Sequence, residues 1–335
     1  MPSGSRPRWA IVGSNAEFSP SEHTRSGHGQ QSASDDRWRG FRSGLAPSIL
    51  TPMTDVLRRH AVRVSGNPGG RPMVFAHGFG CDQTLWRFVT PAFEADHRVV
   101  TFDYVGAGAS DRAAYDPERY ASLQGYADDI LAIIRALDLH DVMLVGHSVS
   151  ATIAMLAEIA EPADDRRIGR MILVTPSPRY LDDLPAYRGG FSRADIDGLL
   201  AMMDVNAMGW AAFLAPVVMG NPDRPELSAD LEATFCSIDP AMARQFAEVT
   251  FRADNRADLA KVRTPSLIIQ YTNDAIAPTE VGDYVHRHLA GGTLRHIDAI
   301  GHCPHVSHPA ATIATIRAYL AEGATEPTQP RSASR

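Results

Sequence analysis

The sequence predicts an α/β protein with a mostly parallel, twisted sheet flanked by helices and an all-helical cap inserted between two strands. Short apolar runs alternate with longer amphipathic runs over residues 53–176 and again over residues 260–322. Such alternation favours parallel strands joined by right-handed crossovers. Residues 177–259 instead show helical spacing of apolar residues and no convincing strand. We therefore expect a sheet core built from both outer segments and a helical cap between them.

The expected strands are short and apolar, and turn residues such as Asn67-Pro68-Gly69-Gly70 separate them. The run Val142–Val145 is apolar throughout, which is typical of a parallel strand covered on both faces. In chain order the strands are Val62–Val64, Met73–Ala76, Arg98–Tyr104, Val142–Val145, Met171–Val174 and Leu267–Gln270, and a last strand is expected shortly before His302.

Apolar residues three and four positions apart predict the helices. In the core these are Leu123–Leu137, Ser148–Ala160 and Thr312–Leu320. In the cap they are Arg193–Met203, Ala207–Val218, Pro225–Phe235 and Pro240–Phe251.

The composition excludes several classes of protein. Hydrophobic residues make up 44% and charged residues 21% of 335 residues, which is enough apolar material for a buried core. A net charge of −7 without a cluster of Lys and Arg argues against nucleic-acid binding. No apolar run reaches the ~18 residues that a membrane-spanning helix needs. The three cysteines are far apart, so we expect no disulfide framework and a cytoplasmic location.

Both ends of the chain are expected to be disordered tails. Residues 1–52 are rich in Ser, Arg, Gly and Pro, and they hold too little apolar surface to offset the entropy of ordering. Trp9–Val12 is too short to be the apolar block of a secretory signal. The N-terminal stretch is therefore a tail or an extension upstream of the true start, with translation beginning at Met1 or Met53. Residues 323–335 are expected to form the second tail.

The motif Gly146-His147-Ser148-Val149-Ser150 follows a predicted strand and opens a predicted helix, which is the context of a nucleophile elbow. Small residues are needed there because the strand and helix backbones nearly touch. Gly146 meets this need, and Ser150 is a small residue in the place of the usual second glycine. A serine that only caps a helix is the alternative. Ser148 is our candidate nucleophile.

A second loop, His77-Gly78-Phe79-Gly80, ends an early strand. Stabilising a developing oxyanion requires two backbone N–H groups aimed at one point. The amides of Phe79 and Val149 are the candidates, and glycines beside Phe79 let the loop turn tightly. An ordinary strand-to-loop turn is the alternative.

Asp274 follows the strand Leu267–Gln270, which is the first strand after the cap, and His302 precedes the last helix. A carboxylate can hold an imidazole in the required tautomer and stabilise its protonated form. The chain order Ser, Asp, His is that of α/β-hydrolases, so we predict a triad of Ser148, Asp274 and His302. Asp254 and Asp298 do not follow the right strand. His305 is the alternative to His302.

Two cofactor interpretations compete with this triad. His302, Cys303, His305 and His308 could suggest zinc, but Pro304 and Pro309 break any regular face, and we expect no metal. Gly106-Ala107-Gly108 lacks the third glycine of a nucleotide loop, so we expect a tight turn and no cofactor.

The cap aromatics offer pocket candidates, of which one or two should face the site. They are Phe191, Trp210, Phe213 and Phe246, with Phe251 beside them.

From about Met53 to Leu320 the chain resembles the RsbQ-like α/β-hydrolases, which are bacterial stress-response regulators, and more distantly the plant strigolactone and karrikin receptors. The Ser-Val-Ser form of the elbow is a feature of these receptors that separates them from most esterases and lipases. The stretches that carry the resemblance are Phe75–Gln83, Phe102–Gly106, Gly146–Ala151 and Gly301–His305.

The resemblance implies Ser148 as nucleophile, Asp274 as acid, His302 as base, and the Phe79 and Val149 amides as oxyanion donors. It also implies slow hydrolysis of a small apolar ester or lactone, sensed by a partner such as a PP2C-type phosphatase with a PAS domain. A catabolic carboxylesterase or C–C bond hydrolase without a partner is the alternative. A binding module with a vestigial triad is disfavoured by the intact Ser, Asp and His. A haloalkane dehalogenase would need Asp in place of Ser148.

Overall fold

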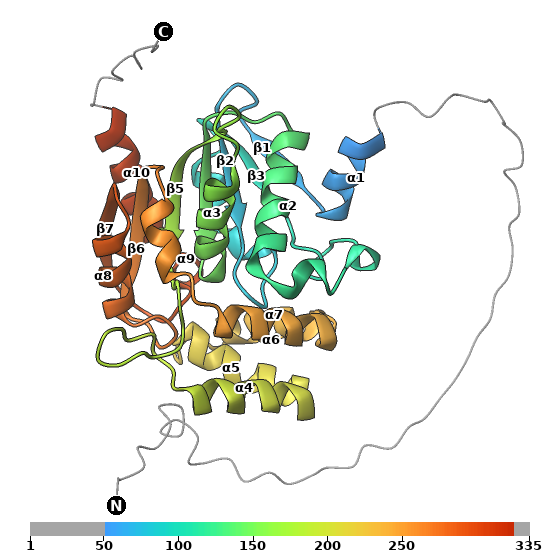
Figure 1. The fold of residues 1–335 in the computed structure, drawn as a ribbon, viewed down its shortest axis with the longest axis vertical. Coiled ribbons are helices and arrows are strands. Elements are labelled where there is room, and N and C mark those ends of the chain that lie inside the picture. Colours follow the sequence, from blue (N-terminus) through green and yellow to red (C-terminus); the bar gives the residue numbers. More distant parts are fainter. Residues whose placement is uncertain (1–50, 325–335) are drawn as a thin grey trace, which may run out of the picture. The chain divides into compact units, whose positions relative to one another are not determined.

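A computed structural model describes residues 51–324 and shows a seven-stranded sheet of order β1-β3-β2-β4-β5-β6-β7 (Figure 1). Strand β1 pairs antiparallel with β3, and every other neighbouring pair is parallel. This confirms the predicted α/β-hydrolase fold with its mostly parallel sheet. The strands are β1 (Arg63–Gly66), β2 (Arg71–Ala76), β3 (His97–Thr101), β4 (Val142–His147), β5 (Ile168–Val174), β6 (Ser266–Asn273) and β7 (Gly292–Ile300).

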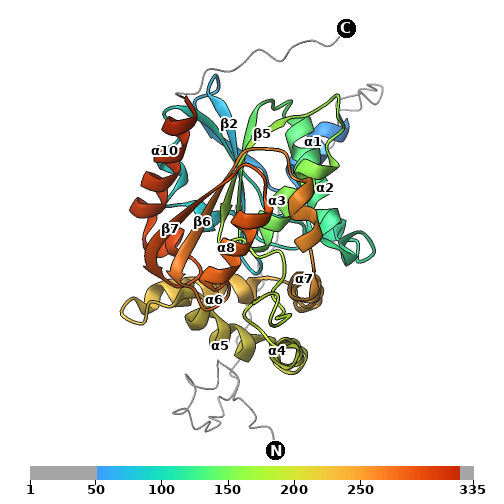
Figure 2. The same cartoon turned by 60° about the vertical axis from the view of Figure 1, so that its left-hand side comes forward.

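Helices cover both faces of the sheet, which explains the apolar strand sequences. Alternate residues of each strand point to opposite faces. Val74 and Leu144 pack in a cluster with α2 (Leu123–Ala136), α3 (Val149–Ala160) and α8 (Thr279–His288). Met73 and Val145 belong to a second cluster with α10 (Pro309–Ala324). Figure 2 shows α10 and α2 on opposite sides of the sheet.

Four consecutive helices, inserted between β5 and β6, lie together at one end of the sheet (Figure 1). They are α4 (Arg193–Val205), α5 (Ala207–Met219), α6 (Pro225–Ser237) and α7 (Pro240–Arg252). Their inward side chains form a third hydrophobic cluster, which includes Leu214, Leu231 and Phe251. We refer to these four helices as the cap.

The structure corrects several sequence-based boundaries. Helix α1 (Thr51–Arg59) was not predicted, and it begins within the stretch expected to be a tail; residues 1–50 lie outside the described residues. The strand predicted over Arg98–Tyr104 ends at Thr101 in β3. The last helix was predicted to end at Leu320 but extends to Ala324, beyond which residues 325–335 are not described.

Helix α8 was also not predicted, and α9 (Pro304–Ser307) is a further short helix beside the last one. The segment Gly106–Gly108 forms a turn, as expected, and the Asp103 carboxylate accepts a hydrogen bond from the Ala109 amide at 2.9 Å. Among residues 51–324 no helix has the length and apolar character needed to cross a bilayer.

Candidate active site

Ser148 sits on a sharp turn between β4 and α3. Its backbone angles are φ 58° and ψ −124°, a positive φ that is uncommon for residues other than glycine. The Ser148 amide donates to the Val174 oxygen at 2.8 Å, which ties the turn to β5. A Cβ on Gly146 would overlap the backbone oxygen of Ser150, so only glycine fits there. The strand and helix backbones therefore approach as the sequence required, and the turn lifts the Ser148 side chain above the sheet edge.

The side chains of Ser148, His302 and Asp274 form a continuous chain of short contacts. His302 Nε2 lies 2.7 Å from Ser148 Oγ, and His302 Nδ1 lies 2.7 Å from Asp274 Oδ2. All three residues are buried. A carboxylate can only accept, so His302 Nδ1 carries the proton and Nε2 faces the Ser148 hydroxyl as an acceptor. This arrangement can remove the serine proton while the carboxylate stabilises the imidazolium that results.

Backbone groups hold the acid and the imidazole in place. Asp274 Oδ1 accepts from the amides of Ile276 at 2.8 Å and Ala277 at 3.0 Å, which leaves Oδ2 for His302. The His302 amide donates to the Val218 oxygen of α5 at 2.7 Å. The position of the imidazole therefore depends on the cap as well as on the core.

The alternative acids and the alternative base lie elsewhere. Asp254 forms ion pairs with Arg179 and Arg256, and hydrogen bonding from Arg256 lowers the pKa of Asp254 to about 2. Asp298 accepts a hydrogen bond from Thr272 at 2.8 Å. His305 is fully buried with its ring 4.7 Å from the ring of Trp86. Of these candidate acids and bases, Asp274 and His302 are the pair that meets Ser148.

The two residues whose amides are proposed as oxyanion donors adjoin Ser148: Val149 follows it in the chain, and Phe79 lines the same cavity. Within residues 51–324, no backbone hydrogen bond uses the N–H of Phe79 or of Val149. A Cβ on Gly78 would lie 3.4 Å from the Ser148 Cβ and 2.6 Å from the His147 ring, so the loop after β2 passes directly against the elbow. Both amides are therefore available beside Ser148.

Tyr180 is a site residue that the sequence reasoning missed. Its hydroxyl lies 3.1 Å from Ser148 Oγ and is buried in the segment between β5 and α4. The Ser148 hydroxyl already donates its one hydrogen bond to His302 Nε2. In the contact with Tyr180, the tyrosine hydroxyl is therefore the donor and Ser148 Oγ the acceptor. Burial raises the pKa of Tyr180, which keeps this donor protonated. The sequence signal that could have identified Tyr180 is its position shortly after the strand β5. Parallel strands present their carboxyl ends at one sheet edge, so residues that follow β5 lie near the residues that follow β4.

A small cavity of about 30 Å³ opens beside Ser148. Phe79 and Tyr180 line it from the core, and Leu214, Val218, Phe235 and Phe251 line it from the cap. On the scale of one water per ~10–15 Å³, this space holds only a few atoms. The cavity is therefore small, and most of the side chains that line it are apolar.

Of the predicted cap aromatics, Phe251 lines the cavity at Ser148, whereas the four named pocket candidates pack around it or beside it. Trp210 packs behind the lining, with its ring 5.9 Å from Phe79. Phe191 packs against Phe251 with ring centres 6.3 Å apart. Phe213 is partly buried in the cap cluster, and Phe246 lines an adjoining cavity of about 20 Å³.

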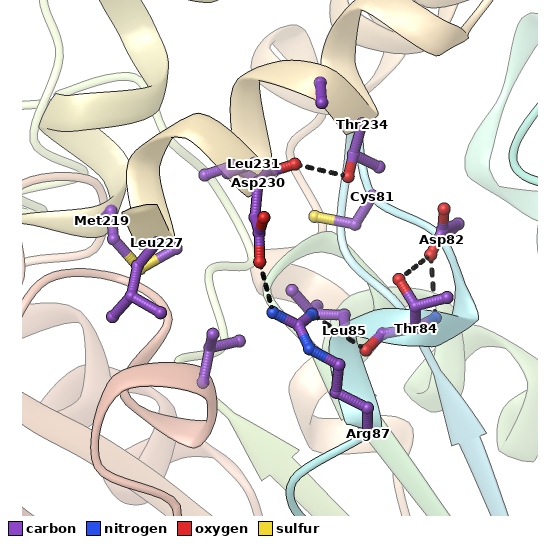
Figure 3. Close-up of a pocket in the computed structure, with 12 residues that line it drawn as sticks. Cys81, Asp82, Thr84, Leu85, Arg87, Met219, Leu227, Asp230, Leu231 and Thr234 are labelled. Carbon is purple, nitrogen blue, oxygen red and sulfur yellow. Dashed lines mark hydrogen bonds and ion pairs between the residues drawn. The ribbon is translucent and has the colours of Figure 1, made fainter. Parts of the chain in front are cut away.

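A larger groove of about 280 Å³ lies on the other side of Cys81, which also lines the cavity at Ser148. Figure 3 shows this groove between α6 and the segment that follows β2. The Arg87 guanidinium and the Asp230 carboxylate, 2.8 Å apart, bridge the core and α6 there. Burial raises the pKa of the Cys81 thiol, so Cys81 acts here as an apolar wall.

The His and Cys residues near the elbow assemble differently from the zinc cluster that the sequence suggested. His308 is exposed, whereas His147, Cys303 and His305 are buried with one candidate ligand atom each within 4.8 Å of the others. Burial raises the pKa of the Cys303 thiol well above its usual value. Because metal binding uses the thiolate, this environment disfavours it. His147 Nε2 instead lies 2.9 Å from the backbone oxygen of His302 and so contacts the main chain that carries the imidazole.

The buried histidines should make the free energy of unfolding depend on pH. Burial lowers the pKa of His305 to about 3 and lowers that of His147 well below its usual value. In the unfolded chain both return to about 6.5, so from pH ~6.5 down to ~3 the unfolded state binds more protons. The free energy of unfolding should therefore be greatest above pH ~6.5 and fall with pH. Each histidine contributes up to about 1.4 kcal/mol per pH unit.

Urea unfolding between about pH 7 and pH 5 measures this dependence. The variant His305→Leu should show a slope shallower by up to about 1.4 kcal/mol per pH unit. The matched control is His286→Leu, because His286 is exposed on α8. Equal slopes for wild type and His305→Leu would contradict the prediction.

Comparisons with known proteins give a consistent result. The model of a family described as "Alpha/beta hydrolase family" matches residues 73–315. The chain is 35% identical over 262 residues to "Karrikin insensitive 2 receptor CA" of Petunia hybrida, covering 78% of this chain and 95% of that protein. It is 35% identical over 257 residues to "Strigolactone esterase RMS3" of Pisum sativum, covering 76% of this chain and 94% of that protein.

A solved structure shares both fold and sequence with this chain. The structure of olei00960, a hydrolase from Oleispira antarctica, superposes with a TM-score of 0.77 at 40% identity. The match covers 80% of this chain and 97% of that one.

Proposed function

This chain belongs to the alpha/beta hydrolase family, and on that premise we propose that it is a serine hydrolase acting on a small apolar ester or lactone. The observation that carries the proposal is the pair of buried hydrogen bonds that link Ser148, His302 and Asp274. Ser148 Oγ lies 2.7 Å from His302 Nε2, and His302 Nδ1 lies 2.7 Å from Asp274 Oδ2. The small, mostly apolar cavity beside Ser148 supports a short acyl group as the part of the substrate bound there.

The proposed reaction has two halves. Ser148 Oγ attacks the carbonyl carbon while its proton passes to His302 Nε2, and the Phe79 and Val149 amides hold the oxyanion. The tetrahedral intermediate collapses, the C–O bond to the leaving alcohol breaks, and His302 protonates that alcohol. A water molecule then gives a proton to His302 and attacks the acyl-serine ester. The acid departs and Ser148 regains its proton.

Reaction with a fluorophosphonate, followed by mass spectrometry, tests the proposal directly. A single adduct on the peptide that contains Ser148, with loss of p-nitrophenyl acetate turnover in parallel, is the expected result. Absence of an adduct from folded protein, or an adduct on another residue, would overturn it.

Ligand sensing is the physiological role we assign to this hydrolysis. The Ser-Val-Ser elbow and the similarity to a protein named as a receptor support it. In the RsbQ-like form of this role, the protein is a positive regulator of a stress-response PP2C-type phosphatase with a PAS domain. Stimulation of such a phosphatase by wild-type protein, but not by the Ser148→Ala variant, is expected. Fast turnover of one ester class without any effect on the phosphatase would instead identify a catabolic carboxylesterase.

Cys81 should limit the length of the acyl chain, because it lines both the cavity at Ser148 and the larger groove. The variant Cys81→Ala should join the two spaces and favour longer chains. Burying one more methylene is worth about 0.8 kcal/mol, so kcat/KM for p-nitrophenyl butanoate relative to acetate should rise by up to about fourfold per methylene.

The matched control is Cys236→Ala, which removes an exposed thiol on α6. Its chain-length preference should equal that of wild type. An unchanged preference in Cys81→Ala would show that Cys81 is not the partition.

A further inference from the structure

Ser150 lies in the first turn of α3, two residues after Ser148, and is fully buried. Its hydroxyl donates a hydrogen bond to the backbone oxygen of His77. A serine hydroxyl has only one proton, so the 2.9 Å contact between Ser150 Oγ and the Tyr104 hydroxyl must be donated by Tyr104. The serine that replaces the usual glycine is therefore bonded to two other segments of the chain.

His77 completes this network. The Tyr104 amide donates to His77 Nε2 at 3.2 Å, so Nε2 has no proton and Nδ1 carries it. Nδ1 lies 2.9 Å from the Gly78 oxygen, to which it donates. Burial lowers the pKa of His77, which keeps the ring in this neutral form. Because His77, Tyr104 and Ser150 are all buried, water does not compete for these bonds.

We propose that Ser150 is a positioning residue that fixes the spacing of the two oxyanion amides, an inference that rests on the proposed hydrolase function. Phe79 follows His77 by two residues, and Val149 directly precedes Ser150. The bond from Ser150 to His77 therefore joins the loop that carries one amide to the helix that carries the other. Glycine at position 150 could not form this bond.

The spacing matters because both donors must lie ~2.7–3.1 Å from the developing oxyanion. A displacement of ~1 Å in an active site can cost about 10²-fold in rate. Ser150 thus acts on the transition state through the two amides, without touching the substrate.

Kinetics of the Ser150→Ala variant with p-nitrophenyl acetate test this inference. We expect kcat to fall by about 10- to 100-fold while KM changes by less than about threefold, since the amides act mainly on the transition state. The midpoint of the kcat–pH profile should stay constant, because the His302–Asp274 pair is untouched. The affinity for a phenylboronic acid, which forms a tetrahedral adduct with Ser148, should fall by about the same factor as kcat/KM.

Thr152→Val is the matched control. It removes another buried hydroxyl-to-carbonyl bond from α3, in which Thr152 Oγ1 donates to the Ser177 oxygen at 2.9 Å. Its thermal denaturation midpoint should drop about as much as that of Ser150→Ala, because each variant loses one such bond. Its kcat should remain within about twofold of wild type.

The outcomes separate this inference from the proposed function. A folded Ser150→Ala variant with kcat within about twofold of wild type would overturn the inference alone. If that variant does not fold, Ser150→Gly removes the same bond to His77 with the residue that is usual at this position, and a kcat equal to wild type would again overturn it. A wild-type protein that shows neither turnover nor a fluorophosphonate adduct would overturn the hydrolase function itself.

Discussion

The variant Ser148→Ala is expected to lose about 10⁶-fold in kcat for p-nitrophenyl acetate, which corresponds to about 8 kcal/mol of transition-state stabilisation. Alanine has no oxygen to attack the carbonyl, and the remaining rate comes only from binding and the oxyanion amides. Steady-state kinetics over long incubations measure the loss. The Val149 and Phe79 amides should survive, so KM should change little.

The fold should tolerate this change, because alanine is smaller than serine and the turn already accepts a Cβ. Ser148 has a positive φ with a side chain present, so the backbone strain is the same in both proteins. Equal denaturation midpoints would show that the lost activity is chemical. Turnover at the wild-type rate in folded Ser148→Ala would remove Ser148 from the reaction and the proposed mechanism with it.

The variant Asp274→Asn is expected to lose about 10⁴-fold in kcat, as loss of the correct imidazole tautomer does in other serine hydrolases. Asp274 Oδ1 accepts from two backbone amides, so the asparagine oxygen must take that position. Its NH₂ group then points at His302 Nδ1, which must give up its proton to accept. Nε2 becomes protonated and can no longer take the proton of Ser148.

A pH–rate profile distinguishes this cause from simple misfolding. High pH should recover little of the lost rate, because the defect is the tautomer and not the protonation state. The controls are Asp254→Asn and Asp298→Asn, the two carboxylates that contact other residues. Both should keep kcat within about twofold, and a 10⁴-fold loss in either would contradict the assignment of Asp274.

Local sequence explains how much of the fold was predictable. All four cap helices begin where the sequence predicted, and the first turns of three carry recognisable capping residues. Ser192 and Asp195 form a capping box at α4, and the side chains of Asn206 and Asp239 cap α5 and α7. The missed helix α8 has no side-chain cap hydrogen bond. The start of α8 was therefore not indicated by a capping side chain of the kind found at α4, α5 and α7.

Contacts between distant segments explain what was missed. Tyr180 reaches Ser148 from a segment whose sequence shows only a loop, and Tyr104 reaches Ser150 from beyond the end of β3. The cap aromatics were visible as a group. Which of them face the cavity depends on how each helix is rotated against the core, and that rotation is set by packing.

The sequence by itself determined the succession of the strands and of the four cap helices along the chain, the elbow at Ser148 and the three residue types of the candidate triad. It could do so because turns, caps and apolar periodicity are local, and because parallel strands bring their carboxyl ends to one edge. Only the tertiary structure decided the rest. It placed His302 and not His305 against Ser148, and it gave Ser150 its partners. Those choices depend on ångström-scale distances between segments far apart in the chain, which close packing and buried hydrogen bonds between those segments fix.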